Sequence, residues 1–138
     1  MSVWTYVDGY IEFNVNGKHS DDLEKLIKRT LGKIVTFDDL MNCEEECITS
    51  LPMGSEGSLE YELIKTQDSY LSVFSNSALR DFDDFNEIND WLYSVVKNEE
   101  INYLVQNVFM RTTNSYGDKA FFYLERHTDK LKYIRLSD

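Results

Sequence analysis

The segment 84–97 constrains the fold more than any other, because it is the clearest amphipathic helix in the chain. Asp84 and Glu87 form a D-x-x-E pattern, typical of a capping box in which each side chain accepts a hydrogen bond from a free backbone N–H. The apolar residues of the segment span roughly 140° of the helix surface, enough to cover a sheet face. They are Phe85, Ile88, Trp91, Leu92, Val95 and Val96. We therefore predict a helix over 84–97 that packs on a β-sheet.

The N-terminal segment 3–15 alternates strictly between two sets of side chains. One set is largely apolar, and the other places Trp4, Tyr6 and Tyr10 beside acidic residues. Alternation with a period of two indicates a β-strand, and Gly9 inside it is typical of a bulge or a bend. We predict a long antiparallel strand with one core face and one amphipathic face.

A second amphipathic helix is predicted over 21–32. Asp21 and Glu24 offer a capping box, and Gly32 is typical of a C-terminal stop. The basic residues near the C-terminal end of this segment complement the negative end of the helix dipole. The apolar stripe of this helix consists of Leu23, Leu26, Ile27 and Leu31.

The rest of the chain is predicted to form short strands joined by turns. Thr36 caps a helical turn that runs towards Met41, and 52–58 is a loop with two glycines. Strands are expected at 34–35, 47–51, 59–66, 70–74, 101–112 and 120–126, while 131–136 either extends the sheet or frays as a tail.

This order of elements predicts an α+β fold in a single domain over 1–138. Two helices cannot cover both faces of an antiparallel sheet of five to six strands, so we expect both helices to pack on one face. The other face would then present Trp4, Tyr6 and Tyr10 to solvent, to a partner or to a second copy of the chain.

The charge of the chain restricts its partners. There are 25 acidic residues against 14 lysines and arginines, giving a net charge of −11. This charge opposes direct binding to nucleic acid or to an anionic membrane, and it favours partners with basic surfaces. No apolar run is long enough to span a bilayer, and we recognise no signal peptide. We expect a cytoplasmic protein whose two cysteines are reduced.

Two groups of acids are candidates for recognising a basic partner. The first lies on the polar side of the helix predicted over 84–97, and the second lies between Cys43 and Cys47. A solvated helix face or catalytic carboxylates are the alternatives for the first group. The first group consists of Asp83, Glu87 and Asp90, and the second of Glu44, Glu45 and Glu46.

The sequence offers little support for a metal or for catalysis. Cys43 and Cys47 have the spacing of two ligands on one helix face, and either His19 or His127 could complete a zinc site. The two histidines are isolated from each other, however, and no second close pair of ligands exists. We expect no metal, no cofactor and no enzyme activity, since no nucleophile motif is present either.

Two further features have two interpretations each, namely the loop Gly54–Ser58 and the single residue Arg80. The loop has the glycines of a phosphate-binding loop but lacks its lysine, so a strained turn at the sheet edge is favoured. Arg80 is expected to form a structural ion pair with Asp81, Asp83 or Glu87, and gripping an anion is the alternative.

Several of these stretches resemble a group of small proteins encoded by phages and prophages of Gram-positive bacteria. They are Ser2–Ile11 (SVWTYVDGYI), Gly54–Ser58 (GSEGS), Leu79–Asp81 (LRD), Asn86–Ile88 (NEI) and Trp91–Leu92 (WL). The resemblance implies a protein that acts in the cytoplasm of a host cell, and small acidic phage proteins often bind and disable host or defence proteins. It assigns no catalytic or binding residue.

We therefore expect a non-enzymatic phage-type accessory protein that binds and inhibits a host or defence protein through an acidic surface. The alternative is a protein that sequesters a small molecule such as a signalling nucleotide. That protein would use the Gly54–Ser58 loop, Arg80 and aromatic side chains, and would need oligomerisation to gather enough cations in one pocket.

Overall fold

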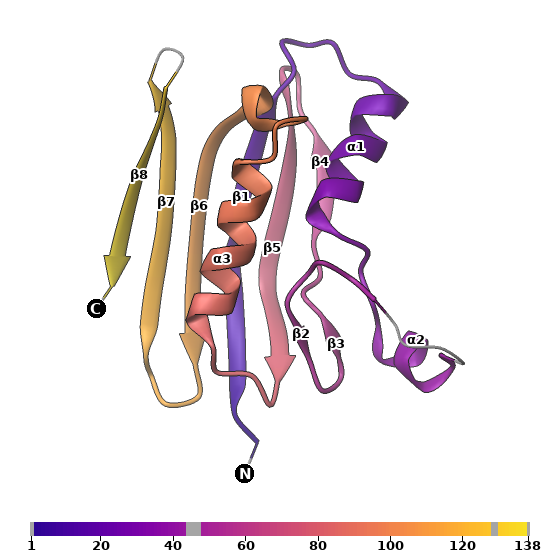
Figure 1. Cartoon of the computed structure of the whole chain (residues 1–138), viewed down its shortest axis with the longest axis vertical. Coiled ribbons are helices and arrows are strands. Elements are labelled where there is room, and N and C mark those ends of the chain that lie inside the picture. The colour runs from indigo at the N-terminus through magenta and orange to yellow at the C-terminus, as the bar shows by residue number, and fades with distance from the viewer. Residues whose placement is uncertain (1, 44–47, 128–129, 138) are drawn as a thin grey trace.

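The structure is a computed structural model that describes residues 2–43, 48–127 and 130–137. It is an α+β fold built on an antiparallel sheet, as the sequence predicts (Figure 1). The strands are β1 (Trp4–Asn14), β2 (Met53–Gly54), β3 (Gly57–Ser58), β4 (Glu62–Lys65), β5 (Ser69–Arg80), β6 (Val105–Asn114), β7 (Lys119–His127) and β8 (Lys130–Ser137). The helices are α1 (Asp21–Leu31), α2 (Phe37–Met41) and α3 (Phe85–Val96), with a 3₁₀ turn at Asn102–Leu104.

The main sheet has six strands in the order β4-β5-β1-β6-β7-β8, and every neighbouring pair is antiparallel. The first strand of the chain therefore lies in the middle of the sheet. Val7 of β1 sits opposite Ser77 of β5 on one side and Thr112 of β6 on the other. The strands β2 and β3 form a separate small hairpin.

Helices α1 and α3 both pack on one face of the sheet (Figure 1), which confirms the predicted layering. Trp91 of α3 is buried, and its ring makes a T-shaped contact with that of Phe74 of β5 at a centroid distance of 5.7 Å. Its indole Nε1–H donates to the carbonyl of Leu31 at 3.0 Å, so it also joins α3 to the C-terminal end of α1.

The caps differ in detail from the predicted boxes. Ser20, and not Asp21, caps α1 by accepting the N–H of Leu23. Asp84 caps α3 by accepting the N–H groups of Asn86 and Glu87. No return bond from the Asp84 N–H to the Glu87 carboxylate is formed within the described residues, so only half of the predicted box is present.

Strand β5 continues well beyond Phe74, where the sequence predicts its end. A bulge makes this continuation hard to predict, because Ser75 and Asn76 both face Asp8 of β1. The Asn76 N–H donates to Asp8 Oδ1 at 2.6 Å, and Asn76 adopts a φ of 47°. The bulge therefore lies beside Gly9, as predicted, although its extra residue belongs to the partner strand.

Two strands predicted between α1 and β4 are not present. The pair 34–35 is not a strand. Among the described residues, the Val35 N–H donates to the hydroxyl of Ser58 and the Val35 carbonyl accepts the N–H of Ser58, at 2.8 Å each. Residues 48–51 are irregular, and Cys47 lies outside the described residues. The predicted loop 52–58 instead contains the β2–β3 hairpin.

Two findings bear on the expected environment of the protein. Cys43 is disulfide-bonded, so the expectation that it is reduced is wrong. None of the helices in the described part of the chain has the length and apolar character that crossing a membrane requires.

Candidate functional site

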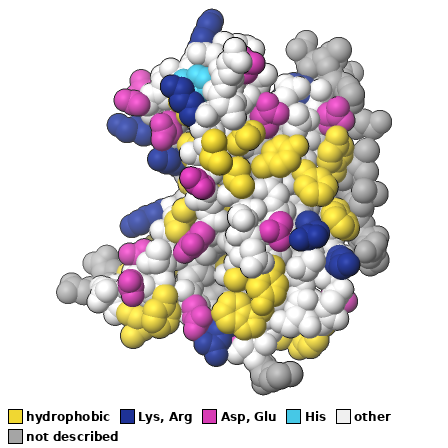
Figure 2. All heavy atoms as spheres, turned by 180° about the vertical axis from the view of Figure 1, so that it is seen from behind, with side chains coloured by type: hydrophobic (Ala, Val, Ile, Leu, Met, Phe, Trp, Pro, Cys, Tyr) yellow, Lys and Arg dark blue, Asp and Glu magenta, His cyan; other side chains and the backbone are white. Residues whose placement is uncertain are grey.

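No described helix covers the sheet face opposite α1 and α3 (Figure 2). The strand register places Tyr10 of β1 between Val73 of β5 and Phe109 of β6. Phe109 in turn lies opposite Tyr123 of β7. Tyr10 is 37% exposed, and Phe109 and Ile64 are each 39% exposed. Aromatic side chains from three neighbouring strands therefore meet on an open surface.

We call the apolar part of this surface the apolar band. It runs across the sheet from β4 to β7, and Figure 2 shows hydrophobic side chains gathered there. The rings of Phe109 and Phe121 lie 6.2 Å apart within it. The members of the apolar band are Ile64, Leu71, Val73, Tyr10, Phe109, Phe121 and Tyr123.

Carboxylates border the apolar band. Glu12 accepts hydrogen bonds from Ser69 Oγ at 2.8 Å and from Asn107 Nδ2 at 2.9 Å, so both of its oxygens are held in place. Glu125 accepts the hydroxyl of Tyr123 at 2.8 Å, and this bond is the main reason why the pKa of Tyr123 is raised. No salt bridge among the described residues includes Glu12, so the rim carries a negative charge held in a fixed position there.

We call the whole uncovered side of the sheet, opposite α1 and α3, the open face. Trp4 and Tyr6 also lie on it, towards the other end of β1. Their rings are stacked with centroids 6.4 Å apart and planes 12° apart. The guanidinium of Arg80 lies 6.0 Å from the centre of the Trp4 ring. The sequence-predicted aromatic residues Trp4, Tyr6 and Tyr10 are therefore all on the open face.

Arg80 does not pair with the predicted acids. Its Nη1 lies 2.6 Å from Glu56 Oε1, and its Nε donates to Ser2 Oγ at 3.2 Å. The prediction fails because Arg80 is a strand residue opposite Trp4, whereas Asp83 lies beyond a turn, next to the helix layer. Arg80 therefore joins the β2–β3 hairpin to the open face.

The loop named as a phosphate-binding candidate borders a pocket of about 340 Å³. Trp4, Glu56 and Ser58 contribute to its lining. The structure thus brings together the Gly54–Ser58 loop, Arg80 and an aromatic ring, as the nucleotide alternative requires. The only salt bridge of Arg80 within the described residues is with Glu56, and this carboxylate would compete with any phosphate.

The predicted acidic residues of α3 are exposed, but they lie in the helix layer, away from the open face. Asp83 precedes the helix, while Glu87 and Asp90 lie within it. Partial desolvation of its carboxyl group, followed by repulsion from Asp84, raises the pKa of Glu87 although the residue as a whole is exposed. The structure therefore does not unite these acids with the sheet aromatics. Residues Glu44, Glu45 and Glu46 lie outside the described residues.

The described residues offer no obvious metal centre. No three His, Cys, Asp or Glu side chains among them are arranged to hold an ion. The ring of His19 is hydrogen-bonded to the backbone, with Nε2 3.0 Å from the carbonyl of Ser69 and Nδ1 3.3 Å from that of Gly17.

Most of the apolar band was not predicted from the sequence. Phe109, Phe121 and Tyr123 each alternate with buried neighbours along β6 and β7, and this period-two signal could have placed them on the face opposite the core. The sequence does not say which strands flank β1, so it could not place these residues beside Tyr10.

Fold and surface together define an α+β protein with a half-covered antiparallel sheet and an acid-rimmed apolar surface. In comparisons with known proteins, no family model matches the chain, and neither a curated protein nor a solved structure is significantly similar to it.

Proposed function

We propose that this protein is a non-enzymatic binding protein that inhibits another protein with a basic surface. The observation that carries this proposal is the open sheet face, where Tyr10, Phe109 and Ile64 are exposed together. A contiguous apolar patch with a polar rim is typical of an interaction site, because leaving it in water is costly. Aromatic side chains are also the usual anchors of protein interfaces.

The charge pattern determines the kind of partner that this face suits. Glu12 and Glu125 border the apolar band, and the chain as a whole carries a charge of −11. Arg111 on this face is already paired with Asp8, at 3.4 Å. A partner that places lysine or arginine around an apolar centre would gain both burial and complementary charge.

The resemblance to phage and prophage proteins suggests the identity of the target. A host or defence protein that binds nucleic acid through a basic groove is the natural candidate, because carboxylates can stand in for phosphates there. Inhibition would follow from occupying that groove, in the cytoplasm of the host cell.

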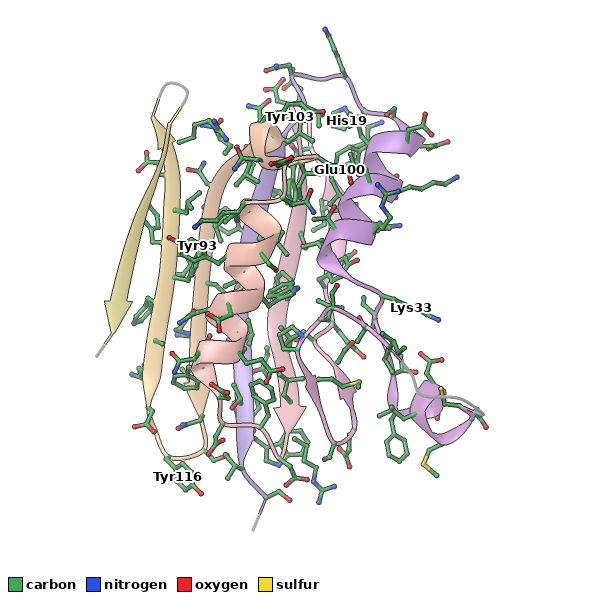
Figure 3. All side chains as sticks on the ribbon, in the orientation of Figure 1. His19, Lys33, Tyr93, Glu100, Tyr103 and Tyr116 are labelled. Carbon is green, nitrogen blue, oxygen red and sulfur yellow. The ribbon has the colours of Figure 1, made fainter. Side chains whose placement is uncertain are left out.

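A capture experiment with matched variants tests the proposal. The double variant Tyr10→Ser/Phe109→Ser removes the centre of the open face. The control Tyr116→Ser removes an exposed aromatic residue at the β6–β7 turn, away from that centre (Figure 3). We expect wild type and Tyr116→Ser to capture the same host protein and to inhibit its purified form. The double variant should do neither, although it should remain folded.

A captured protein that binds the double variant as strongly as wild type would contradict the proposal. Self-association of the open face is the other outcome. It would appear as a dimer of the wild type in analytical ultracentrifugation, and as a monomer of the double variant.

Sequestration of a signalling nucleotide is the second candidate function, and the pocket at Trp4 and Ser58 favours it. Releasing Arg80 by Glu56→Gln should then strengthen nucleotide binding, because the competing carboxylate is removed.

A further inference from the structure

A groove separate from the open face gathers basic side chains of this acidic protein. It lies between the C-terminal end of α1 and the edge strand β4, and its volume is about 700 Å³. This volume falls within the range of roughly 300–1,000 Å³ that is usual for small-molecule pockets. Its lining consists of Lys28, Arg29, Gly32, Lys33, Ile34, Tyr61, Glu62 and Leu63.

The lining residues carry three positive charges and one negative charge, in a chain of net charge −11. Lys28 is paired with Glu24 at 3.1 Å, and Arg29 with Glu100 at 2.8 Å. No salt bridge within the described residues includes Lys33, whose side chain extends from the segment between α1 and α2 (Figure 3). In Figure 2 the outline is hollowed on this side, and both basic and acidic side chains stand on its walls.

Helix dipoles normally repel anions from a helix C-terminus, but here the carbonyl groups are occupied by donors. The Leu31 carbonyl accepts the indole N–H of Trp91 at 3.0 Å and the hydroxyl of Ser50 at 3.3 Å. The Gly32 carbonyl accepts the hydroxyl of Tyr61 at 3.3 Å. These hydrogen bonds offset part of the negative potential that the carbonyl groups at this helix end would otherwise present to an anion.

The groove also has an apolar floor. Tyr61 is half-buried, and its ring lies 5.7 Å from that of Phe74. Ile34 and Leu63 pack against the core from the same side. A ligand that fills the groove must therefore combine an apolar body with negative charge.

We propose that the α1–β4 groove binds a small organic phosphate that carries a flat ring. The phosphate contacts Arg29 and Lys33, since a guanidinium has five N–H donors and can hold Glu100 and a phosphate together. The ring lies against Ile34, Tyr61 and Leu63. This site is distinct from the open face, and it does not depend on the function proposed above.

A titration of the full chain followed by amide NMR tests the proposal. Adenosine 5′-monophosphate is the probe. Adenosine, which has the ring without the phosphate, and inorganic phosphate, which has the charge without the ring, are titrated separately. We expect the monophosphate to shift the amides of 28–34 and 61–63 with a dissociation constant of about 1 mM or lower. Each half alone should bind at least about tenfold more weakly, because it uses only one wall of the groove.

Matched charge variants locate the site. Arg29→Gln/Lys33→Gln should weaken binding of the monophosphate about tenfold, and Lys33→Gln alone, which breaks no salt bridge, about threefold. The control Lys25→Gln/Lys65→Gln removes the same charge from α1 and β4 outside the groove lining, and should change binding less than twofold. The open-face variant Tyr10→Ser/Phe109→Ser should bind the probe like wild type.

Three outcomes would overturn the proposal. The first is an absence of shifts around the groove at about ten times the expected dissociation constant. The second is equal weakening in the control double variant, which would indicate attraction to net charge alone. The third is adenosine or inorganic phosphate binding as tightly as the monophosphate.

Discussion

Trp91 connects three parts of the core through one side chain. It packs on Phe74 of β5, and its indole N–H is bonded to the Leu31 carbonyl at the end of α1. Replacing it by alanine would leave a cavity and would also remove the bond between α1 and α3. Replacing it by phenylalanine would keep most of the ring contact and lose the hydrogen bond.

We predict that Trp91→Ala lowers the free energy of unfolding by roughly 3–5 kcal/mol. Trp91→Phe should lower it by about 1–2 kcal/mol, close to the value of one buried hydrogen bond. Urea denaturation followed by circular dichroism measures both. A loss below about 1 kcal/mol for the alanine variant would show that the indole contributes little to the core.

Glu87 provides a residue-scale test of electrostatics, because its pKa is raised by partial desolvation and then by repulsion from Asp84. A carboxyl group with a raised pKa in the folded state favours folding while it is protonated, and this contribution is lost as the pH rises through that pKa. At neutral pH the charged side chain therefore destabilises the fold slightly.

We predict that Glu87→Gln is more stable than wild type at pH 7, and that the difference disappears at a pH below the ordinary pKa of glutamate. Urea denaturation of both proteins at the two pH values measures the effect. If the glutamine variant were less stable at pH 7, favourable interaction of Glu87 with the N-terminus of α3 would outweigh burial and repulsion.

At the scale of elements, α3 has one buried side and one acidic side. Nothing in the packing of Trp91 requires acids at Asp83, Glu87 and Asp90, and like charges in neighbouring turns oppose a helix by roughly 0.2–0.5 kcal/mol per pair. The acidic side is therefore either a solvated surface or a contribution to binding a basic partner.

We predict that the triple change Asp83→Asn/Glu87→Gln/Asp90→Asn leaves the thermal midpoint unchanged or higher. If these acids attract the partner, association should become slower while dissociation changes little, since they lie away from the open face. Association rates over a series of salt concentrations measure this. A variant with the wild-type rate and salt dependence would show that this side of α3 is only solvated.

At the scale of the whole molecule, an exposed apolar band coexists with a net charge of −11. Mutual repulsion of such charge keeps copies of the chain apart at neutral pH, even though their apolar faces could associate. This repulsion vanishes near the sequence isoelectric point of about 4.5.

We predict that lowering the pH from 7 towards 5 promotes self-association of the wild type at low salt. Tyr10→Ser/Phe109→Ser should associate much less, because the apolar band drives the contact. Light scattering coupled to size-exclusion chromatography measures the mass. Tyr116→Ser is the matched control and should associate like the wild type. Equal association of the wild type and the double variant would show that another surface drives the contact.

The sequence by itself determined the features that arise from local periodicity. The alternation in β1 and the apolar stripes of α1 and α3 fix which side of each element faces the core, since side-chain direction follows directly from backbone geometry. These rules predicted the α+β fold, the placement of both helices on one face, and the position of Trp4, Tyr6 and Tyr10 on the other, where Tyr10 is exposed and Trp4 and Tyr6 are half-buried. Capping residues likewise located the helix ends to within a residue or two.

Only the tertiary structure decided which distant segments meet. The position of β1 between β5 and β6 places Phe109 beside Tyr10, and the bulge at Ser75–Asn76 carries β5 on to Arg80 and its partner Glu56. The fold also brings α1 against β4, which gathers the cations of the groove. Such contacts depend on strand order and register, which arise from the packing of the whole core and leave no periodic signal along the chain.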